Sequence, residues 1–444
     1  MGPGHTIEPM LFATLTENRL LRFPIKFAEF PSQSADFSVF LSYPSIITFL
    51  TSRRRHPAGP DMSEPTKILI VRPSALGDVC RTVPALASLR RRYPEARIDW
   101  VVNSAYQPAI VAHPHLSHVI PFPRDRFAHW WRSPRAFGEL SSWLRALRAN
   151  RYDLVLDLQG LGRSGFITRT TAAPRRVGYR SAREYAWLGY TTRHAPPKSR
   201  HAVDQMLELL AREGIPAIHD MRLYAPDAGR DVWQDRAAML GLTPDTSYAV
   251  LAPTSRWLSK RWPPEYWVNI IPRLRHLGFE RSLIIGAPGE EPQIQPLIEA
   301  ARAGTVDAEL LIGQTGIAET MAIIASAGLV IANDSAPLHM AVGFGRPLLG
   351  LFGPTDPAVV GPYRHDHSVL RTPDAERPKD AYFKDSQLGD RLMRAITPDM
   401  VLDAVERIVS TSPTDPPVSD GAMPGSAETA DQLDAISGTN RPHT

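Results

Sequence analysis

The sequence contains almost no cysteine and no long apolar run, and these two absences exclude several classes of protein. Cys80 is the only cysteine among the 444 residues, so the chain has no internal disulfide framework and no cysteine-cluster zinc or iron–sulfur site. We find no stretch of about 18 or more apolar residues, which is the length that a membrane-spanning helix needs. A lone thiol is typical of a reducing compartment, and we expect a cytoplasmic protein.

The sequence also lacks a strong excess of charge of either sign. Lys and Arg together number 50 and Asp and Glu 46, which gives a formal net charge of +4. Over this length such a surplus does not indicate a nucleic-acid partner, although it is compatible with an anionic substrate or with a lightly basic face near a membrane. Hydrophobic residues make up 43% of the chain, which is ordinary for a globular protein, and the length accommodates roughly two domains.

Proline is abundant, and much of it lies in loops and at the two ends. The chain has 42 prolines, about double the usual share of roughly 5%. Residues 1–61 have no sustained hydrophobic period, and we interpret them as a disordered or untranslated extension, with Met62 as the candidate native start. The segment 411–444 is rich in Pro, Ser, Thr, Gly and Asp, so we expect a disordered tail.

Between these ends, short apolar runs alternate with helical patterns in two successive series. Apolar runs bounded by turns are typical of strands buried on both faces, and the apolar stripe from Phe137 to Leu147 has helical spacing. In the first series the expected strands are residues 68–71, 98–102, 118–122, 153–158 and 176–179. In the second they are 249–252, 282–285, 310–312, 329–332 and 348–352, with helices near 264–277, 291–303, 317–327 and 336–345 and with Gly278 and Gly328 at helix ends.

This alternation predicts two open α/β domains with mostly parallel sheets. The polar stretch 225–246 contains two prolines and two glycines, and we place the domain boundary there. The expected Rossmann-like domains span 66–230 and 246–396, and a C-terminal helix over 397–410 follows them. Two such domains can face one another across a cleft at the carboxyl ends of their strands, where ligands bind in this kind of fold.

Two loops of the first domain carry polar residues directly after a strand. In the loop at 72–78, Gly77 permits a tight turn and Asp78 lies near the start of the next helix. Asp78 is either an N-cap, worth about 1 kcal/mol, or a general base that the helix dipole keeps ionised. The loop at 157–165 has three glycines and Arg163, which could hold an anion. It does not have the GxGxxG spacing, so a plain strand–helix turn remains the alternative.

The second domain has three comparable segments. Residues 253–263 combine hydroxyls, cations and a following helix start, which suits a pyrophosphate; a solvated basic loop is the alternative. In residues 333–339, Pro337 suits a first helical turn, and the backbone amides of Ser335 and Ala336 with His339 would form an anion site. A buried structural histidine is the alternative there. The turn at 350–357 is equally compatible with a structural role and with ligand contact.

Together these segments resemble glycosyltransferase family 9, the ADP-heptose:lipopolysaccharide heptosyltransferases. The matching stretches, in the family order from Lys67 to Ser410, are ILIVRPSALGDV, TVPALASLRRRYP, DLQGLGRSG, SKRWPPEYW, NDSAPLHMA and LFGPTDP. The resemblance implies the GT-B fold, in which two Rossmann-like domains face across a cleft. That expectation agrees with the two α/β domains that the alternation predicts.

The resemblance also implies residue roles. Asp78 corresponds to the proposed catalytic base of the family, and Lys260 to the lysine that binds donor phosphate. The remaining donor-side residues are Thr254, Ser255, Arg261, Asp334, Ser335, Ala336 and His339, with Glu290 or Glu291 for the ribose, and the acceptor-side residues are Ser74, Gly77, Gln159 and Arg163. Ala336 stands where the family more usually has glycine.

The implied reaction is an inverting, single-displacement transfer of heptose from ADP-heptose to a lipopolysaccharide core acceptor of the Kdo–lipid A type. No cofactor or metal is expected, because the cleft loops contain no DxD-like carboxylate pair. The expected partners are a nucleotide-sugar donor and a glycolipid at the inner surface of the cytoplasmic membrane, and no nucleic acid. Basic residues at 90–92, 175–176 and Lys198 could contact that membrane or could simply be solvated.

Two alternatives remain open. A transferase of the same architecture could use another nucleotide sugar or another glycoconjugate acceptor, since pyrophosphate-binding motifs do not read the sugar. A non-catalytic nucleotide-sugar-binding protein could keep the fold. A nicotinamide dehydrogenase is disfavoured, because the glycine fingerprint and its acidic partner are missing.

Overall fold

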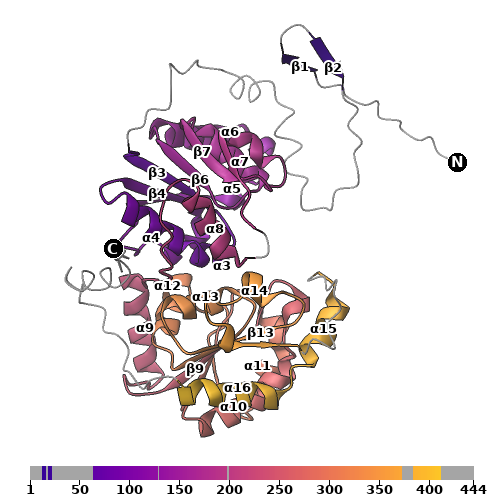
Figure 1. Cartoon of the computed structure of the whole chain (residues 1–444). Coiled ribbons are helices and arrows are strands. Elements are labelled where there is room, and N and C mark those ends of the chain that lie inside the picture. Colours follow the sequence, from indigo (N-terminus) through magenta and orange to yellow (C-terminus); the bar gives the residue numbers. More distant parts are fainter. Residues whose placement is uncertain are drawn as a thin grey trace, which may run out of the picture. The chain divides into compact units, whose positions relative to one another are not determined.

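The structure is a computed structural model that describes residues 13–16, 19–22, 64–128, 130–197, 200–372 and 384–411. The chain divides into two compact units, with unit 1 ending at Tyr224 and unit 2 beginning at Ala225 (Figure 1). Strands β1 (Ala13–Thr16) and β2 (Arg19–Arg22) pair as an antiparallel hairpin. The disorder expected for the remainder of 1–61, and for the tail after Thr411, lies outside the described residues.

Unit 1 contains a sheet of six parallel strands in the order β5-β4-β3-β6-β7-β8. The strands are β3 (Lys67–Val71), β4 (Arg97–Asn103), β5 (His118–Phe122), β6 (Leu154–Asp157), β7 (Arg175–Tyr179) and β8 (Thr192–His194). Every strand predicted in the first series is present. The short and polar β8 was not predicted, because Thr-Arg-His has no apolar run.

The helices of unit 1 pack in two groups. They are α3 (Leu76–Arg81), α4 (Val83–Arg92), η2 (Ser104–Ala109), α5 (Arg124–Phe127), η3 (Trp130–Arg132), α6 (Pro134–Ala149), α7 (Gly162–Thr170), η4 (Ala186–Gly189) and α8 (Ala202–Ala211). Helix α4 packs against α8, whereas α6 packs against α5 and α7 (Figure 1). Thr82 ends α3 and precedes α4, whose first turn contains Pro84, so a new helix starts there.

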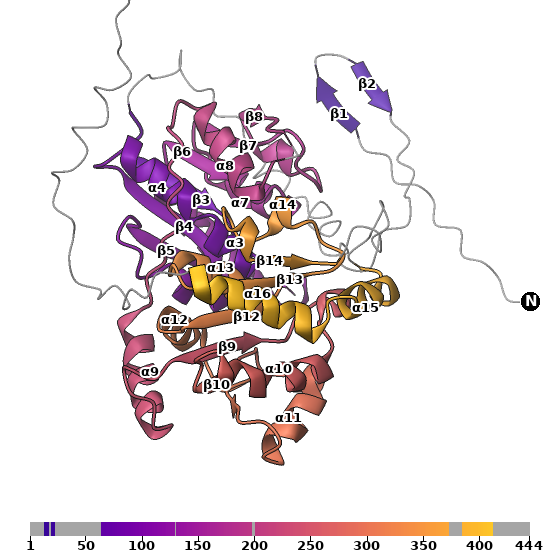
Figure 2. The ribbon, with the colours of Figure 1, turned by 60° about the horizontal axis from the view of Figure 1, so that its bottom comes forward.

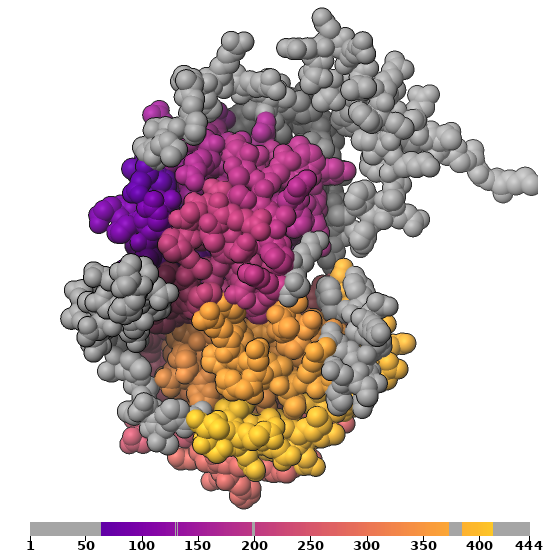
Figure 3. Space-filling model, viewed as in Figure 1, coloured from indigo at the N-terminus to yellow at the C-terminus, as the bar shows by residue number. Residues whose placement is uncertain are grey.

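Unit 2 repeats the same arrangement, with a six-stranded parallel sheet in the order β11-β10-β9-β12-β13-β14. Its strands are β9 (Tyr248–Ala252), β10 (Arg281–Ile284), β11 (Glu309–Leu310), β12 (Leu329–Asn333), β13 (Leu348–Phe352) and β14 (Val369–Arg371). Figure 2 shows β9, β12, β13 and β14 side by side. Its helices are α9 (Asp227–Met239), η5 (Leu258–Lys260), α10 (Pro264–His276), η6 (Glu291–Ile294), α11 (Gln295–Arg302), α12 (Ile317–Ala325), α13 (Ala336–Gly343), α14 (Pro357–Val360), η7 (Asp366–Ser368), α15 (Ser386–Arg394) and α16 (Pro398–Thr411). The C-terminal helices lie at the surface of this unit, in yellow in Figure 3.

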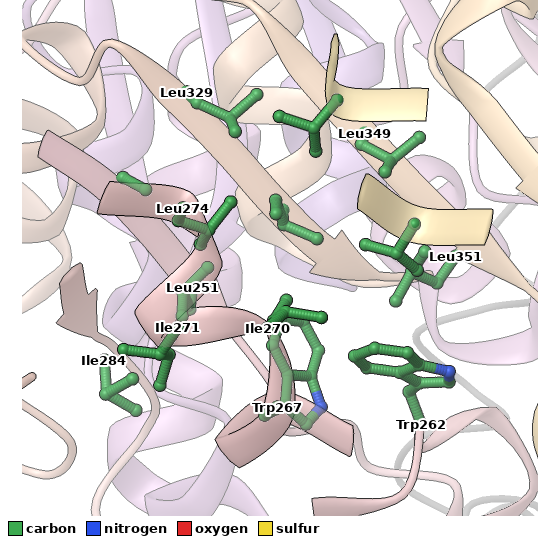
Figure 4. Close-up of a cluster of buried hydrophobic side chains, with 14 of the residues drawn as sticks. Leu251, Trp262, Trp267, Ile270, Ile271, Leu274, Ile284, Leu329, Leu349 and Leu351 are labelled. Carbon is green, nitrogen blue, oxygen red and sulfur yellow. The ribbon is translucent and has the colours of Figure 1, made fainter. Parts of the chain in front are cut away.

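The core of unit 2 anchors the loop that follows β9. Trp262 is 1% exposed and its ring lies 5.1 Å from that of Trp267 in an edge-on arrangement, which is a favourable geometry for aromatic pairs. The Trp262 Nε1 donates to the Ile396 carbonyl over 2.7 Å. Figure 4 shows both indoles within the cluster that Leu251 and Leu351 also join. The loop around Lys260 is therefore tied at one end to a rigid core.

One helix of unit 2 was not predicted and one glycine was assigned wrongly. The stretch 225–246, where we placed the domain boundary, begins at the division between the units and contains helix α9. Gly229 lets α9 approach the backbone of Ala318 on α12, and Trp233 packs edge-on against Tyr248 at 5.8 Å. Gly278 has a φ of +93° just after α10, as a helix C-cap requires. Gly328 does not have a positive φ, and it serves a close approach to the Ser247 hydroxyl instead.

Both units have the doubly wound topology. Numbered from the first strand of each sheet, the order is 3-2-1-4-5-6 in both, which is the Rossmann order. The predicted pair of Rossmann-like folds is thereby confirmed. The order reverses between β3 and β6 in unit 1 and between β9 and β12 in unit 2, and ligands bind outside the carboxyl ends of the strands at such switch points.

One tight contact in unit 1 yields a stability prediction. A Cβ atom on Gly165 of α7 would lie 2.5 Å from the Ala186 Cα and carbonyl oxygen, so Gly165→Ala should destabilise unit 1 by about 1–3 kcal/mol through overpacking. Gly138, on the exposed side of α6, has nothing within 4 Å of such a Cβ. Gly138→Ala should stabilise by up to about 1 kcal/mol, because alanine is the better helix former. Urea unfolding followed by circular dichroism measures both changes, and shifts of the same sign would contradict the packing argument.

Candidate functional site

In unit 1 the two loops at the switch point are hydrogen-bonded to one another. The Ser74 amide donates to Gln159 Oε1 over 3.2 Å, and Gln159 Nε2 donates to Ser74 Oγ over 3.1 Å. The buried Asp157 shapes the second loop by accepting the Gln159 and Gly160 amides at 2.9 Å each. Two of the predicted acceptor-side residues, Ser74 and Gln159, are therefore brought into direct contact.

Asp78 lies in the first turn of α3 between two arginines. Its Oδ2 atom is 3.1 Å from an Arg72 guanidinium nitrogen, and Oδ1 accepts a hydrogen bond from Arg81. The N-cap residue is Ala75, and its amide donates to Asp78 Oδ2 over 3.3 Å. Asp78 is therefore not the N-cap residue. It occupies N3 and accepts the N-cap amide, as the acidic residue of a capping box does.

The Asp78 carboxylate is accessible and held ionised. Its side chain is 28% exposed. Burial by itself raises the pKa of the carboxyl, but the charges of Arg72 and Arg81 and the hydrogen bonds from Arg81 and Ala75 outweigh burial and hold the pKa well below its usual range. The two arginines were not among the predicted site residues. Arg81 stands three positions after Asp78, a spacing that places two side chains on the same helix face.

Two further predicted residues of unit 1 lie in different surroundings. Gly77 belongs to the first turn of α3, beside Asp78. Arg163 lies in the first turn of α7 and lines a pocket between α5, α6 and α7. The other residues that line this pocket are hydrophobic, apart from Arg124.

In unit 2 the loop after β9 is linked to the loop after β10. Thr254 Oγ1 donates to Glu290 Oε2 over 2.6 Å, and the same oxygen accepts the Ala287 amide at 3.0 Å. The neighbouring Arg261 Nε donates to the Ser255 carbonyl over 2.8 Å. Glu290 is thus the carboxylate bonded to the predicted donor loop.

Lys260 and Asp334 form an ion pair between the two loops at the switch point of unit 2. The Lys260 Nζ lies 2.6 Å from Asp334 Oδ2, and the two side chains are 15% and 9% exposed. Asn333 joins the same loops, because its Oδ1 accepts the Trp262 amide at 3.2 Å and its Nδ2 donates to the Pro253 carbonyl over 2.6 Å. Asn333 is fully buried, and the sequence reasoning assigned it no role.

The segment after β12 forms the start of α13 as predicted. Ser335 is the N-cap, Pro337 lies in the first turn, and His339 follows within that turn at 3% exposure. The buried Ser335 Oγ has no hydrogen-bond partner among the residues that the structure describes. Backbone N–H groups at a helix N-terminus attract anions. Asp334 directly precedes this helix start, so the Lys260–Asp334 pair lies beside it.

The described residues contain neither a metal-binding cluster nor a membrane-spanning helix. Among them, no group of three or more His, Cys, Asp or Glu side chains is arranged to hold a metal ion. No helix in the described ranges combines the length and the apolarity needed to cross a bilayer.

Two doubly wound α/β units, each with polar loops at its switch point, are the architecture of the GT-B class of folds. The sequence model for glycosyltransferase family 9 (heptosyltransferase) matches residues 140–387. The chain belongs to this family and is a glycosyltransferase.

Individual relatives agree with the family. Lipopolysaccharide heptosyltransferase 1 of Escherichia coli K12 is 31% identical over 313 residues, which cover 69% of this chain and 94% of that protein. The structure of E. coli heptosyltransferase WaaC with ADP matches with a TM-score of 0.62 and 28% identity, over 77% of this chain and 99% of that one. The structure of WaaC with ADP-2-deoxy-2-fluoro heptose matches with a TM-score of 0.60, 28% identity and the same coverage.

Proposed function

We propose that this protein transfers heptose from ADP-heptose to a lipopolysaccharide core acceptor of the Kdo–lipid A type, with inversion and without a metal ion. The observation that carries the proposal is the Lys260–Asp334 pair beside the start of α13, on the two loops that flank the switch point of unit 2. The WaaC relative binds ADP and a fluorinated ADP-heptose in its structures, which supports the choice of donor.

The donor diphosphate is bound by unit 2. Lys260 supplies an ammonium with three N–H donors, so it can keep its bond to Asp334 while it binds a phosphate oxygen. Arg261 adds a second cation, and the amides at Ser335 and Ala336, with His339, meet the diphosphate at the start of α13. Thr254 and Ser255 supply hydroxyls.

For the ribose, Glu290 is the better of the two predicted carboxylates. Glu290 is bonded to Thr254 in the donor loop, whereas the carboxylate of Glu291 packs against Gly313. A carboxylate accepts hydrogen bonds from both ribose hydroxyls, as the acidic residue of dinucleotide-binding folds does.

The acceptor is bound by unit 1, where Asp78 acts as the base. Asp78 takes the proton of an acceptor hydroxyl while that oxygen forms a bond to the anomeric carbon and the bond to ADP breaks. One displacement inverts the anomeric configuration. The charge that develops on ADP is stabilised by Lys260, Arg261 and the α13 N-terminus. Ser74, Gly77, Gln159 and Arg163 line the acceptor side, and the reaction takes place at the cytoplasmic face of the inner membrane.

A donor panel tests this proposal. Calorimetry should detect binding of ADP and ADP-heptose. Transfer from ADP-heptose to a Kdo–lipid A acceptor should occur even with EDTA present. NMR of the product should show that the anomeric configuration is inverted. ADP-glucose, GDP-mannose and UDP-N-acetylglucosamine are the matched donors. Transfer from one of these in preference to ADP-heptose would move the assignment to another sugar, and no binding of any nucleotide sugar would contradict a transferase role for this site.

The pH dependence of turnover should respond to Arg81. Arg81→Gln removes one of the two charges that lower the pKa of Asp78, so the pKa rises and the base becomes protonated at a higher pH. The acidic limb of the kcat/KM profile should move up by about one pH unit or more. Arg92→Gln is the matched control, because Arg92 pairs with Glu64 outside the loop. An unchanged acidic limb in Arg81→Gln would show that Asp78 is not the group whose protonation sets that limb of the kcat/KM profile.

A further inference from the structure

A buried tyrosine and a buried aspartate lie next to the acceptor-side loop of unit 1, and neither has a role in the proposed reaction. Asp157 is the last residue of β6 and is fully buried, and Tyr190 directly follows η4 and is 5% exposed. The Tyr190 hydroxyl donates to Asp157 Oδ2 over 2.7 Å. Burial and the Asp157 charge raise the pKa of Tyr190, so the hydroxyl keeps its proton and is the donor of this bond.

The fold makes room for this pair with glycines. Asp157 lies opposite Gly178 of β7 in the register of the sheet. A Cβ atom on Gly178 would lie 2.5 Å from Tyr190 Cζ, so any side chain there would displace the ring. Gly189, the last residue of η4, packs against the Gly165 backbone of α7, which fixes the segment that carries the tyrosine. The hydroxyl therefore reaches across β7 to a carboxylate on the neighbouring strand.

The other oxygen of Asp157 sets the shape of the loop. Asp157 Oδ1 accepts the Gln159 and Gly160 amides at 2.9 Å each. Burial raises the pKa of the Asp157 carboxyl, and the hydrogen bonds from Gly160, Tyr190, Ser164 and Gln159 oppose that rise. A buried carboxylate depends on such donors. Loss of the tyrosine hydroxyl would therefore weaken the hold of this carboxylate on the two loop amides.

The same loop is joined to the loop that carries Asp78. The Gln159 side chain forms two hydrogen bonds with Ser74, one to its amide and one to its hydroxyl. The Leu158 carbonyl accepts a hydrogen bond from Arg72, the arginine that also pairs with Asp78. We call residues 72–78 and 157–161 the acceptor loops. A shift of 157–161 would displace Gln159 and Ser74, whereas Asp78 would keep its contacts within α3.

We propose that Tyr190 is a positioning residue for the acceptor, and that it acts through Asp157 to hold Gln159 and Ser74 in the arrangement that binds the acceptor sugar. The inference rests on the proposed function, which places the acceptor at these two side chains. Tyr190 and Asp157 are themselves buried, so they act through geometry and not through contact. The competing explanation is that the tyrosine only stabilises the fold, as any donor to a buried carboxylate does.

Unit 1 contains a second pair of the same kind, which provides a matched control. The Tyr152 hydroxyl donates to Asp99 Oδ2 over 2.6 Å, and both residues are buried. Tyr152 precedes β6, and Asp99 lies in the first half of β4. This pair is therefore at the amino ends of the strands, on the edge of the sheet opposite the acceptor loops. Tyr152→Phe removes a hydroxyl from a buried aspartate without changing a contact of those loops.

Steady-state kinetics of Tyr190→Phe and Tyr152→Phe, with the acceptor varied at saturating donor, distinguish the two explanations. Tyr190→Phe should raise the acceptor KM roughly tenfold and change kcat no more than about threefold, because the residues that bind the acceptor are displaced slightly. ADP affinity, measured by calorimetry, should be unchanged. Tyr152→Phe should leave all three quantities at their wild-type values. The unfolding midpoints of both variants should fall by similar amounts, because each leaves a buried carboxylate with one donor fewer.

A double variant tests whether the effect passes through Gln159. Gln159→Leu removes both hydrogen bonds to Ser74 and should itself raise the acceptor KM. Tyr190→Phe combined with Gln159→Leu should raise the KM no further than Gln159→Leu alone, since the two residues are then steps of one chain of contacts. If the unfolding midpoint shows that Tyr190→Phe does not fold, Asp157→Asn replaces it with Asp99→Asn as its control. Each of these removes the charge of a buried carboxylate and keeps its size.

Amide hydrogen exchange of the full chain adds a readout that does not require turnover. Tyr190→Phe should speed exchange in the acceptor loops, and Tyr152→Phe should not. Equal rises of the acceptor KM in the two variants, a fall in kcat with unchanged KM, or additive effects in the double variant would overturn the positioning role. Wild-type protein that transfers no heptose, while Tyr190→Phe still speeds exchange in both loops, would remove the proposed function alone. Unchanged exchange and unchanged KM in an active enzyme would remove the positioning role alone.

Discussion

Replacing Asp78 with alanine is expected to lower kcat by roughly 10²–10⁴-fold, the range that a positioned general base contributes, and to leave ADP affinity unchanged. The acceptor hydroxyl must lose its proton as the new bond forms, and Asp78 is the accessible carboxylate at the switch point of unit 1. The donor residues belong to unit 2, so their binding to ADP does not depend on this side chain. Steady-state kinetics and calorimetry with ADP measure the two effects separately.

Two further variants separate chemistry from structure at this position. Asp78→Asn keeps the size of the side chain and an acceptor for the Ala75 amide, but it cannot take a proton, so its kcat should fall as far as that of Asp78→Ala. Asp125→Asn alters an exposed acidic residue in the first turn of α5 and should retain wild-type kcat. Turnover by Asp78→Ala within tenfold of the wild-type rate would remove Asp78 as the base.

Most of the fold was predictable because the central strands of both sheets are short and largely apolar. Burial on both faces leaves no room for polar residues, so β3, β9 and β12 are recognisable without any tertiary information. Helix α9 was missed for the opposite reason. Its sequence is polar, and it is held by contacts of Gly229 and Trp233 with α12 and Tyr248, which only the three-dimensional arrangement reveals.

The sequence predicted which loops carry the site residues, but it did not predict which of those residues contact one another. Polar residues directly after buried strands identify the positions of Asp78 and Lys260, since strand ends meet at one edge of a parallel sheet. Which residues become partners depends on distances across the sheet. The position of Arg72 beside Asp78, and the bridge that Asn333 makes between two loops, are set by the neighbouring strands. The roles of Asp78 and Lys260 were implied by the family resemblance, because spacing alone does not name a substrate.

Replacing Lys260 with alanine is expected to weaken binding of ADP and ADP-heptose by roughly 10- to 100-fold, which corresponds to the loss of one hydrogen bond to a charged group. The ammonium lies 2.6 Å from Asp334, so its removal also leaves a largely buried carboxylate to repel the diphosphate. Lys384→Ala is the matched control. It removes a lysine of unit 2 whose Nζ lies 5.4 Å from the Trp257 ring, and it should change donor affinity no more than about twofold.

Substituting Asp334, the partner of Lys260, provides a sharper test than Lys260→Ala alone. Asp334→Asn removes the carboxylate that opposes the donor in Lys260→Ala, so the double variant should bind ADP more tightly than Lys260→Ala alone. In the wild-type protein, Asp334→Asn frees the Lys260 ammonium but removes the carboxylate that positions it. The change in ADP affinity should therefore be smaller than that caused by Lys260→Ala. Calorimetric titration of the four proteins completes a double-mutant cycle, and the coupling should be at least about 0.5 kcal/mol for residues in direct contact. Additive effects would mean that Lys260 and Asp334 do not meet the diphosphate as a pair, and the geometry proposed for the donor site would then be incorrect.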